Sequence, residues 1–153
     1  AALDFAPPPG NLGWVRSSEW VVAAADGMIV RSDHGAVVQS LDGDEHMQTG
    51  WALLYMHIET RDRVPKGTYL KAGERIGHPS CEGGISSGTH LHLARLYNGE
   101  WIPADQDMPF NLEGWVSRGS GGPYQGILKR GDTVIRADEN RQDTNLISRS
   151  QSQ

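Results

Sequence analysis

Short apolar and β-branched runs, cut by turn signals, dominate the first part of this chain. Runs at 19–24, 28–31 and 36–41 are separated by Asp26-Gly27 and by Asp33-His34-Gly35. Asp-Gly and His-Gly steps between apolar runs are typical of tight turns between antiparallel strands. The pattern therefore predicts a series of hairpins.

The same pattern continues through the middle of the chain. A polar loop at 42–50 precedes a longer apolar run at 51–58, which carries His57 near its end. Two turn-plus-strand segments at 64–77 and a glycine-rich loop then lead into His90-Leu91-His92. No window of a dozen residues has a convincing helical period of 3.6. We expect an all-β fold, mainly antiparallel sheet with long loops and few or no helices.

The pattern loosens beyond Trp101, where one further strand is expected at 133–135. Residues 138–153 are polar and lack aromatic side chains, which predicts a disordered tail. A chain of 153 residues is long enough for one domain with a buried core, and its 19 glycines and 8 prolines indicate many turns. We expect a single domain over residues 1–137, followed by the tail.

Charge and cysteine usage narrow the classes of partner. The formal net charge is −5 and the sequence has no run of Lys or Arg, which argues against nucleic acid as a partner. No apolar stretch approaches the roughly 20 residues of a transmembrane helix. The single cysteine, Cys81, gives no evidence of an oxidising compartment and is expected to be a small buried side chain.

The segment His90-Leu91-His92 carries the candidate chemistry. On an extended strand, His90 and His92 would point to the same side, roughly 7 Å apart along the strand. The loop at 83–89 is rich in glycine and hydroxyl side chains, so its backbone can approach a substrate closely. This pattern predicts a metal site, and it leaves open whether both imidazoles bind the metal or one acts on substrate.

Seven short pieces of the sequence, spanning residues 1–102, occur together in the order that one enzyme family has. They are residues 1–7, 22–27, 54–57, 71–77, 81–84, 87–92 and 96–99. In these pieces the chain resembles the zinc metallopeptidases of the lysostaphin and LytM type, peptidase family M23. The Cys-Glu-Gly-Gly and Leu-Tyr-Asn-Gly pieces are similar to the staphylolytic, LasA-like branch.

The resemblance implies a LytM-like core, an antiparallel sheet crossed by a substrate groove, and roles for four residues. Asp4 and His92 match the family's ligands to one zinc ion. His57 and His90 match two unligated histidines that serve as acid and base, and which of them does which is left open. In such sites zinc lowers the pKa of its water to around 7 and polarises the scissile carbonyl.

The implied activity is a zinc endopeptidase that hydrolyses cross-bridge or stem peptides of bacterial peptidoglycan, with glycine-containing bonds as candidates. Such an enzyme would be secreted or held in the cell envelope, and we expect a monomer whose partner is the peptidoglycan peptide. Gly88 and Thr89 are candidates for substrate contact. Tyr55 could contact substrate or simply fill the sheet.

One departure from the family pattern supports an alternative. The family has a third zinc ligand, a histidine before the Asp, and no histidine of this sequence takes that place by motif order. We expect that an N-terminal piece is missing. The alternative is a degenerate LytM-like module that binds cell-wall peptide or a partner hydrolase. A lipoyl-like domain fits the segments at 64–77 but needs a lysine at the turn near Asp26-Gly27, where there is none.

The remaining polar candidates have simpler interpretations. His34 and His46 occur in turn-like contexts and His78 precedes a proline, so all three are expected in surface or loop roles. The acidic loop at 42–45 lacks the complete ligand series of a calcium loop, which favours a solvated hairpin tip.

Overall fold

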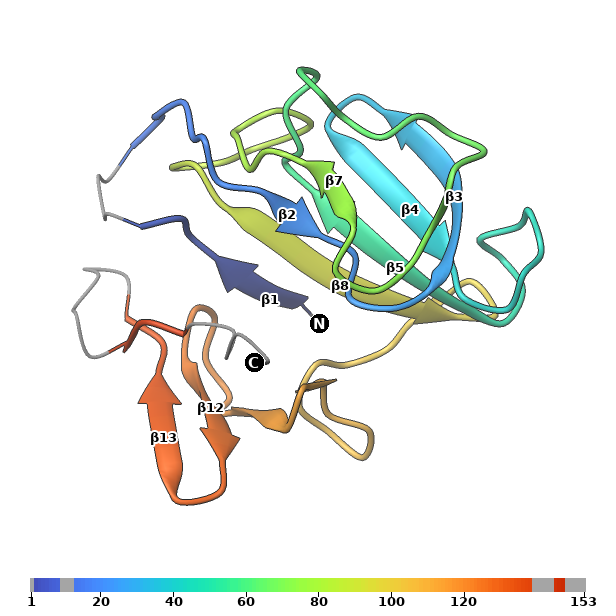
Figure 1. The fold of residues 1–153 in the computed structure, drawn as a ribbon. Helices are drawn as coiled ribbons and strands as arrows, with labels where there is room; N and C mark the ends of the chain where they lie inside the picture. The colour runs from blue at the N-terminus through green and yellow to red at the C-terminus, as the bar shows by residue number, and fades with distance from the viewer. Residues whose placement is uncertain (1, 9–12, 139–144, 148–153) are drawn as a thin grey trace, which may run out of the picture. The chain divides into compact units, whose positions relative to one another are not determined.

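A computed structural model describes residues 2–8, 13–138 and 145–147 of the chain (Figure 1). The chain forms two compact units, residues 1–102 and 103–153. All thirteen elements of the described residues are β-strands. Every strand pairing is antiparallel, which confirms the prediction of an all-β fold. The described residues contain no helix long and apolar enough to cross a membrane.

The first unit is built on a seven-stranded sheet with the order β1-β8-β5-β4-β3-β6, to which β9 adds beside β8. The central strands follow the apolar runs of the sequence, because alternate residues of each run can be buried on the two faces. The strands are β1 (Ala2–Phe5), β8 (Leu91–Tyr97), β5 (Trp51–Met56), β4 (Ala36–Ser40), β3 (Gly27–Asp33), β6 (Tyr69–Leu70) and β9 (Glu100–Trp101).

The core of the first unit lies around β4, which is buried on both faces. Val37 and Val38 point to opposite faces of the sheet and both are fully buried. Gln39 brings a polar group into this core, where its Oε1 accepts a hydrogen bond from the Tyr55 hydroxyl at 2.9 Å. Its Nε2 donates to the Ala25 carbonyl at 2.8 Å, so both ends of the buried amide are satisfied.

One predicted hairpin is correct and one is wrong. The turn at His34 and Gly35 joins β3 to β4, as expected. At Asp26-Gly27, however, β2 (Val21–Val22) does not pair with β3 but with β7 (Arg75–Gly77). The Asp26 carboxylate accepts a hydrogen bond from the Ala72 amide at 2.7 Å, which ties the turn to that distant segment.

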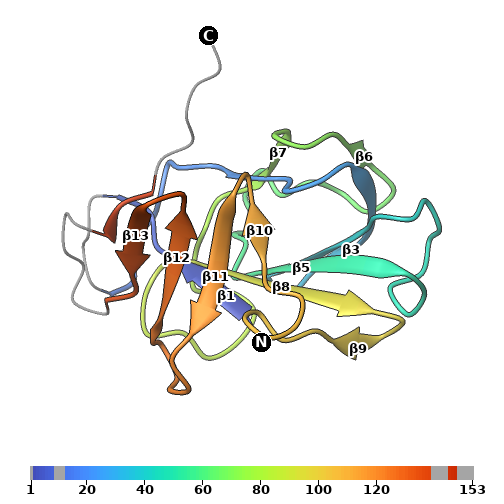
Figure 2. The ribbon, with the colours of Figure 1, turned by 90° about the horizontal axis from the view of Figure 1, so that it is seen from below.

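The second unit is a four-stranded sheet, β10-β11-β12-β13, seen side by side in Figure 2. Its strands are β10 (Asn111–Leu112), β11 (Trp115–Gly119), β12 (Gly126–Arg130) and β13 (Thr133–Arg136). Only the last was predicted, because charged residues such as Arg118 and Arg130 interrupt the apolar pattern of the others. Arg130 covers the buried Trp115 ring, with its guanidinium carbon 4.6 Å from the ring centroid.

The single domain predicted over residues 1–137 would include the first unit and the second unit as far as β13. It stays a prediction. The predicted tail, residues 138–153, lies for the most part outside the described residues.

Candidate active site

A single row of side chains crosses the large sheet and contains two of the predicted site residues. Asp4 of β1 is directly opposite His92 of β8, His92 is opposite Met56 of β5, and Met56 is opposite Ala36 of β4. Directly opposed residues of antiparallel strands project to the same face. The pairing register therefore places Asp4 beside His92, and the Asp4 Oδ1 lies 2.9 Å from the His92 Nδ1.

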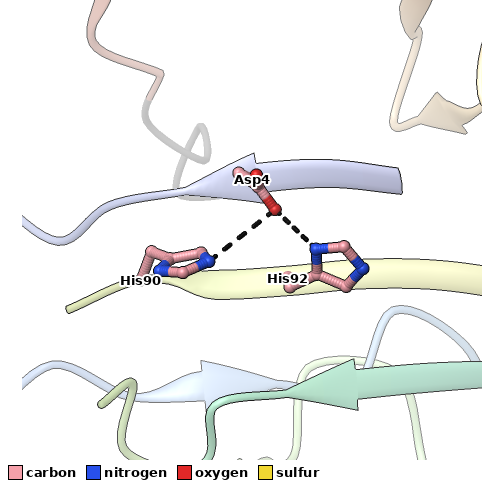
Figure 3. Close-up of side chains that lie close together, drawn as sticks. All are labelled: Asp4, His90 and His92. Carbon is pink, nitrogen blue, oxygen red and sulfur yellow. Dashed lines mark hydrogen bonds and ion pairs between the residues drawn. The ribbon is translucent and has the colours of Figure 1, made fainter. Parts of the chain in front are cut away.

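His90, which immediately precedes β8, also reaches Asp4 (Figure 3). Its Nε2 lies 3.9 Å from the Asp4 Oδ1. Its Nδ1 donates a hydrogen bond to the Gly88 carbonyl at 2.8 Å, since a carbonyl can only accept. The neutral ring consequently carries its lone pair on Nε2, the atom that is turned toward Asp4.

His57 comes close to His90 and His92 because the neighbouring strands β5 and β8 separate at this end of the sheet. Beyond the Met56 and His92 pair, Ser80 lies between the end of β5 and the start of β8, forming a bridge with His90. Strict strand alternation would place the His57 side chain on the face opposite Met56. His57 instead has a φ of 64°, outside the β region. Its ring centroid lies 4.4 Å from that of His90 and 6.2 Å from that of His92.

Glu82 holds the His57 ring in place through its backbone. The His57 Nδ1 donates to the Glu82 carbonyl at 2.8 Å, which leaves the lone pair on Nε2, as in His90. The Glu82 side chain is itself fixed by Thr60, whose amide and hydroxyl donate to the two carboxylate oxygens at 2.9 and 2.6 Å. Glu82 belongs to one of the sequence pieces that resemble the family, at residues 81–84, but no role was predicted for it.

The electrostatics of the site favour an ionised carboxylate and a neutral imidazole. Burial alone would raise the pKa of Asp4, but the hydrogen bond and charge of His92, with the charges of His90 and His57, outweigh it and hold that pKa below its ordinary 3.8. Burial lowers the pKa of His57 below its ordinary 6.5. His57 is therefore uncharged at neutral pH and able to accept a proton.

Asp4, His90 and His92 together fit a small divalent metal ion. One donor atom from each of them lies within 4.8 Å of the other two. Donors around a tetrahedral zinc ion stand roughly 3.3 Å apart, since zinc bonds to nitrogen and oxygen are about 2.0–2.2 Å. The Asp4 distances of 2.9 and 3.9 Å to His92 and His90 bracket that separation. Imidazole and carboxylate are also donors that zinc accepts.

Of the three candidates for substrate contact, Tyr55 does not face the site but fills the sheet, the alternative that the sequence left open for it. It is opposite Leu93, on the other face from His92, and only 1% of it is exposed. Its hydroxyl accepts the Ala24 amide and donates to Gln39, both at 2.9 Å, so it has no free group to offer. Only the pairing register of β5 with β8 shows this placement.

Gly88 and Thr89 build the loop that holds His90. The Gly88 carbonyl accepts both His90 Nδ1 and the Ser86 hydroxyl. Thr89 is buried, and its hydroxyl donates to the Val15 carbonyl at 2.6 Å. Beside this loop, Trp14 is 75% exposed and its Nε1 donates to the Ser86 carbonyl at 3.2 Å. Trp14 was not singled out from sequence, because its proximity to residue 86 depends on the fold.

The other histidines are only partly as predicted. His34 lies in a tight turn and His46 in a loop, and both are exposed. His78 is instead 3% exposed. Its Nδ1 donates to the Glu19 carbonyl at 2.7 Å and its ring packs on Trp20 with centroids 4.0 Å apart. His78 lies outside the strands, as a loop residue would, but it is not at the surface, because the pairing of β2 with β7 covers this segment.

Known peptidases are similar to this chain in sequence and in fold. The model of peptidase family M23 matches residues 3–103. Protease LasA of Pseudomonas aeruginosa is 36% identical over 61 residues, a match that covers 35% of this chain and 14% of LasA. The chain thus corresponds to a small part of this curated relative.

Among solved structures, the M23 metalloprotease pseudoalterin, described as from the deep sea, has a TM-score of 0.68 at 24% identity, covering 89% of this chain and 79% of pseudoalterin. The catalytic domain of the antimicrobial peptidase lysostaphin from Staphylococcus simulans has a TM-score of 0.48 at 28% identity, covering 63% of this chain and 66% of that domain. The likeness to pseudoalterin shows a shared fold.

Proposed function

This chain belongs to peptidase family M23, and from that membership we propose that it is a zinc-dependent endopeptidase acting on bacterial peptidoglycan. The bonds that it cuts lie in cross-bridges or stem peptides, with glycine-containing bonds as the first to test. The observation that supports this most is the convergence of Asp4, His57, His90 and His92 on one end of the sheet. The names of the relatives, a protease and an antimicrobial peptidase, are consistent with it.

In this proposal Asp4 and His92 hold one zinc ion. When bound, zinc would lower the pKa of water to about 7, which supplies a nucleophile at neutral pH, and would polarise the scissile carbonyl. The Asp4 carboxylate stays ionised because its pKa is lowered, so it is ready to coordinate a cation. His92 would exchange its hydrogen bond to Asp4 for the metal, since the same Nδ1 cannot both donate a proton and coordinate.

His57 and His90 carry out the proton transfers. Each ring has its Nδ1 hydrogen tied to a backbone carbonyl, that of Glu82 or that of Gly88, at 2.8 Å. Each therefore presents a basic Nε2 in a fixed orientation. One of them takes a proton from the attacking water and passes it to the leaving amine, and the other stabilises the developing oxyanion when protonated.

A peptidoglycan substrate implies that the protein works outside the cytoplasm, as a secreted or envelope protein. An open sheet face suits an extended peptide, which binds with its backbone stretched along the site. We propose a monomer, because Asp4, His57, His90 and His92 all come from one chain.

The second candidate is a module that binds cell-wall peptide, or a partner hydrolase, without cutting. One feature favours it: the resemblance assigns only two zinc ligands to residues of this chain, where the family has three. Against it stands the presence of all four residues Asp4, His57, His90 and His92, since binding alone does not require them.

The test measures zinc content and cleavage of the chain, using a glycine-rich peptide and purified cell walls. We expect one zinc per chain and cleavage, with both lost in His92→Ala. His90→Ala should keep zinc and lose cleavage if His90 is an acid or base, and should lose both if it is a third ligand. His46→Ala, which removes an exposed loop histidine, is the matched control. Wall binding with neither zinc nor cleavage would establish the binding module instead.

A further inference from the structure

The row that carries the metal-site residues continues into an apolar groove on the same face of the sheet. From Asp4 and His92 the row passes to Met56 and then Ala36. The adjoining row places Leu54 opposite Val38. Val38 is fully buried and forms the floor, while Leu54 and Met56 are partly exposed. The face thus changes from ionisable to apolar within one strand spacing, about 4.8 Å.

This groove is a hollow of about 260 Å³. Met47 and Trp101 complete the apolar part of its lining, and Trp101 is 53% exposed. Met47 and Leu54 pack on the buried cluster that includes Val38, so the floor is a supported surface. Pockets for complete small molecules range from about 300 to 1,000 Å³. A hollow of this size suits one side chain of a larger ligand.

The groove directly adjoins the histidines. A Cβ placed on Gly84 would lie 3.8 Å from the Met56 Cε and 3.9 Å from the His57 Cε1, so both atoms border the same point in space. An extended peptide advances about 3.3 Å per residue. The hollow is one to two strand spacings from His92, which corresponds to roughly two or three residues from the scissile bond.

The polar groups at the rim are already paired. Arg31 donates to the Asp33 Oδ1 at 2.8 and 2.9 Å, and the His34 Nδ1 lies 3.2 Å from the same oxygen. A ligand carboxylate or phosphate would have to compete with the Asp33 carboxylate for the Arg31 guanidinium. The lining therefore favours an apolar group over an anionic one.

We propose that this groove is a specificity subsite that takes an apolar side chain of the peptide substrate, two or three residues from the scissile bond. The inference rests on the proposed peptidase function. It makes an all-glycine peptide a poor substrate, because nothing in such a peptide fills the hollow. Filling a hydrophobic pocket typically changes kcat/KM by about ten- to a hundredfold, and we expect a preference in that range for leucine over glycine.

The test uses matched peptides, each with one glycine of a glycine-rich parent replaced by Ala, Leu, Phe or Glu at the second or third position on either side of the cut. We expect kcat/KM to rise from Gly through Ala to Leu at one of these positions and to be low for Glu. In Trp101→Ser and Leu54→Gln the ratio of Leu to Gly should fall toward one. Tyr69→Ser, which removes a similarly exposed aromatic outside the groove, should keep the ratio.

The outcomes separate the inference from the function on which it rests. Equal cleavage of the Gly and Leu peptides by the unmodified chain would overturn the subsite and leave the peptidase intact. A preference that survives both Trp101→Ser and Leu54→Gln would overturn its location. If the chain cleaves no peptide and no cell wall, with or without added zinc, the proposed peptidase function is overturned, and the subsite with it.

Discussion

Two buried histidines of the first unit, His57 and His78, are held in the same way but have different surroundings. His57 is 6% exposed and donates from Nδ1 to the Glu82 carbonyl at 2.8 Å. His78 is 3% exposed and donates from Nδ1 to the Glu19 carbonyl at 2.7 Å. In both rings the tether fixes the tautomer and leaves Nε2 as the atom that can accept a proton.

The groups around Nε2 separate the two. The His57 ring borders His90, with Asp4 and His92 close by, at an end of the sheet where the strands have separated. The His78 Nε2 lies 3.5 Å from an Asp62 carboxylate oxygen, and its ring is packed on Trp20. A backbone tether thus orients both imidazoles, while their neighbours make His57 a candidate for chemistry and His78 a support for the fold.

The largest expected effect is that of His57→Ala on catalysis. Removing an acid or base typically costs about 10²- to 10⁴-fold in rate, so we expect kcat to fall by that range while zinc content stays at the unmodified level. Steady-state kinetics on cell walls and metal analysis measure the two quantities. A fall of less than tenfold would mean that His57 is merely structural, like its counterpart.

His78→Ala should show the opposite pattern. It leaves the Glu19 carbonyl without its donor and removes the buried ring that packs on Trp20. Such a loss costs about 1–3 kcal/mol of unfolding free energy, measurable as a lower midpoint in urea. Activity per folded molecule should stay within about twofold. The contacts of His78 are with Glu19, Trp20 and Asp62, so its loss should leave the activation barrier at the candidate active site unchanged. His78→Phe, which keeps an aromatic ring there, should recover part of the stability.

A smaller effect is expected from the glutamates whose carbonyls hold the two rings. The Glu82 side chain is fixed by Thr60, so Glu82→Ala should loosen the carbonyl that orients His57. Losing about 1 kcal/mol of hydrogen bonding corresponds to roughly a fivefold lower kcat with little change in KM. Glu19→Ala is the matched control and should leave kcat unchanged.

The pH profile gives the Glu82 prediction a second measurement. If Glu82 positions His57, the acidic limb of the kcat profile should shift in Glu82→Ala, and Glu82→Gln should restore most of the rate by keeping the bonds to Thr60. A profile identical to that of the unmodified chain, with only lower stability, would assign Glu82 a structural role alone.

Much of the large sheet could be predicted from sequence. The apolar runs that became β3, β4 and β5 are long enough for alternate residues to be buried, and the turn at Gly35 joins neighbours. The segment from His90 to His92 predicted a candidate metal site, because residues two apart share a face of a strand. These signals act over a few residues, so they can be read locally.

The parts that were missed depend on partners distant in the chain. β1 has only four residues, and its register with β8 is what sets Asp4 beside His92. The burial of His78 follows from the pairing of β2 with β7, some fifty residues apart. The sequence left open whether Tyr55 contacts substrate or fills the sheet, and only the pairing register shows that it faces the core.

The all-β class, the main strands and the candidate site at His90 and His92 followed from the residue pattern, and the resemblance to a known family added Asp4 and His57. Which side chains meet depends on the tertiary structure: the positive φ that turns His57 toward His90, the Glu82 carbonyl that orients it, and the row that joins the candidate metal site to the apolar groove. The physical reason is that strand alternation and turn propensity are local, whereas register and strand separation are settled by contacts between segments far apart in sequence.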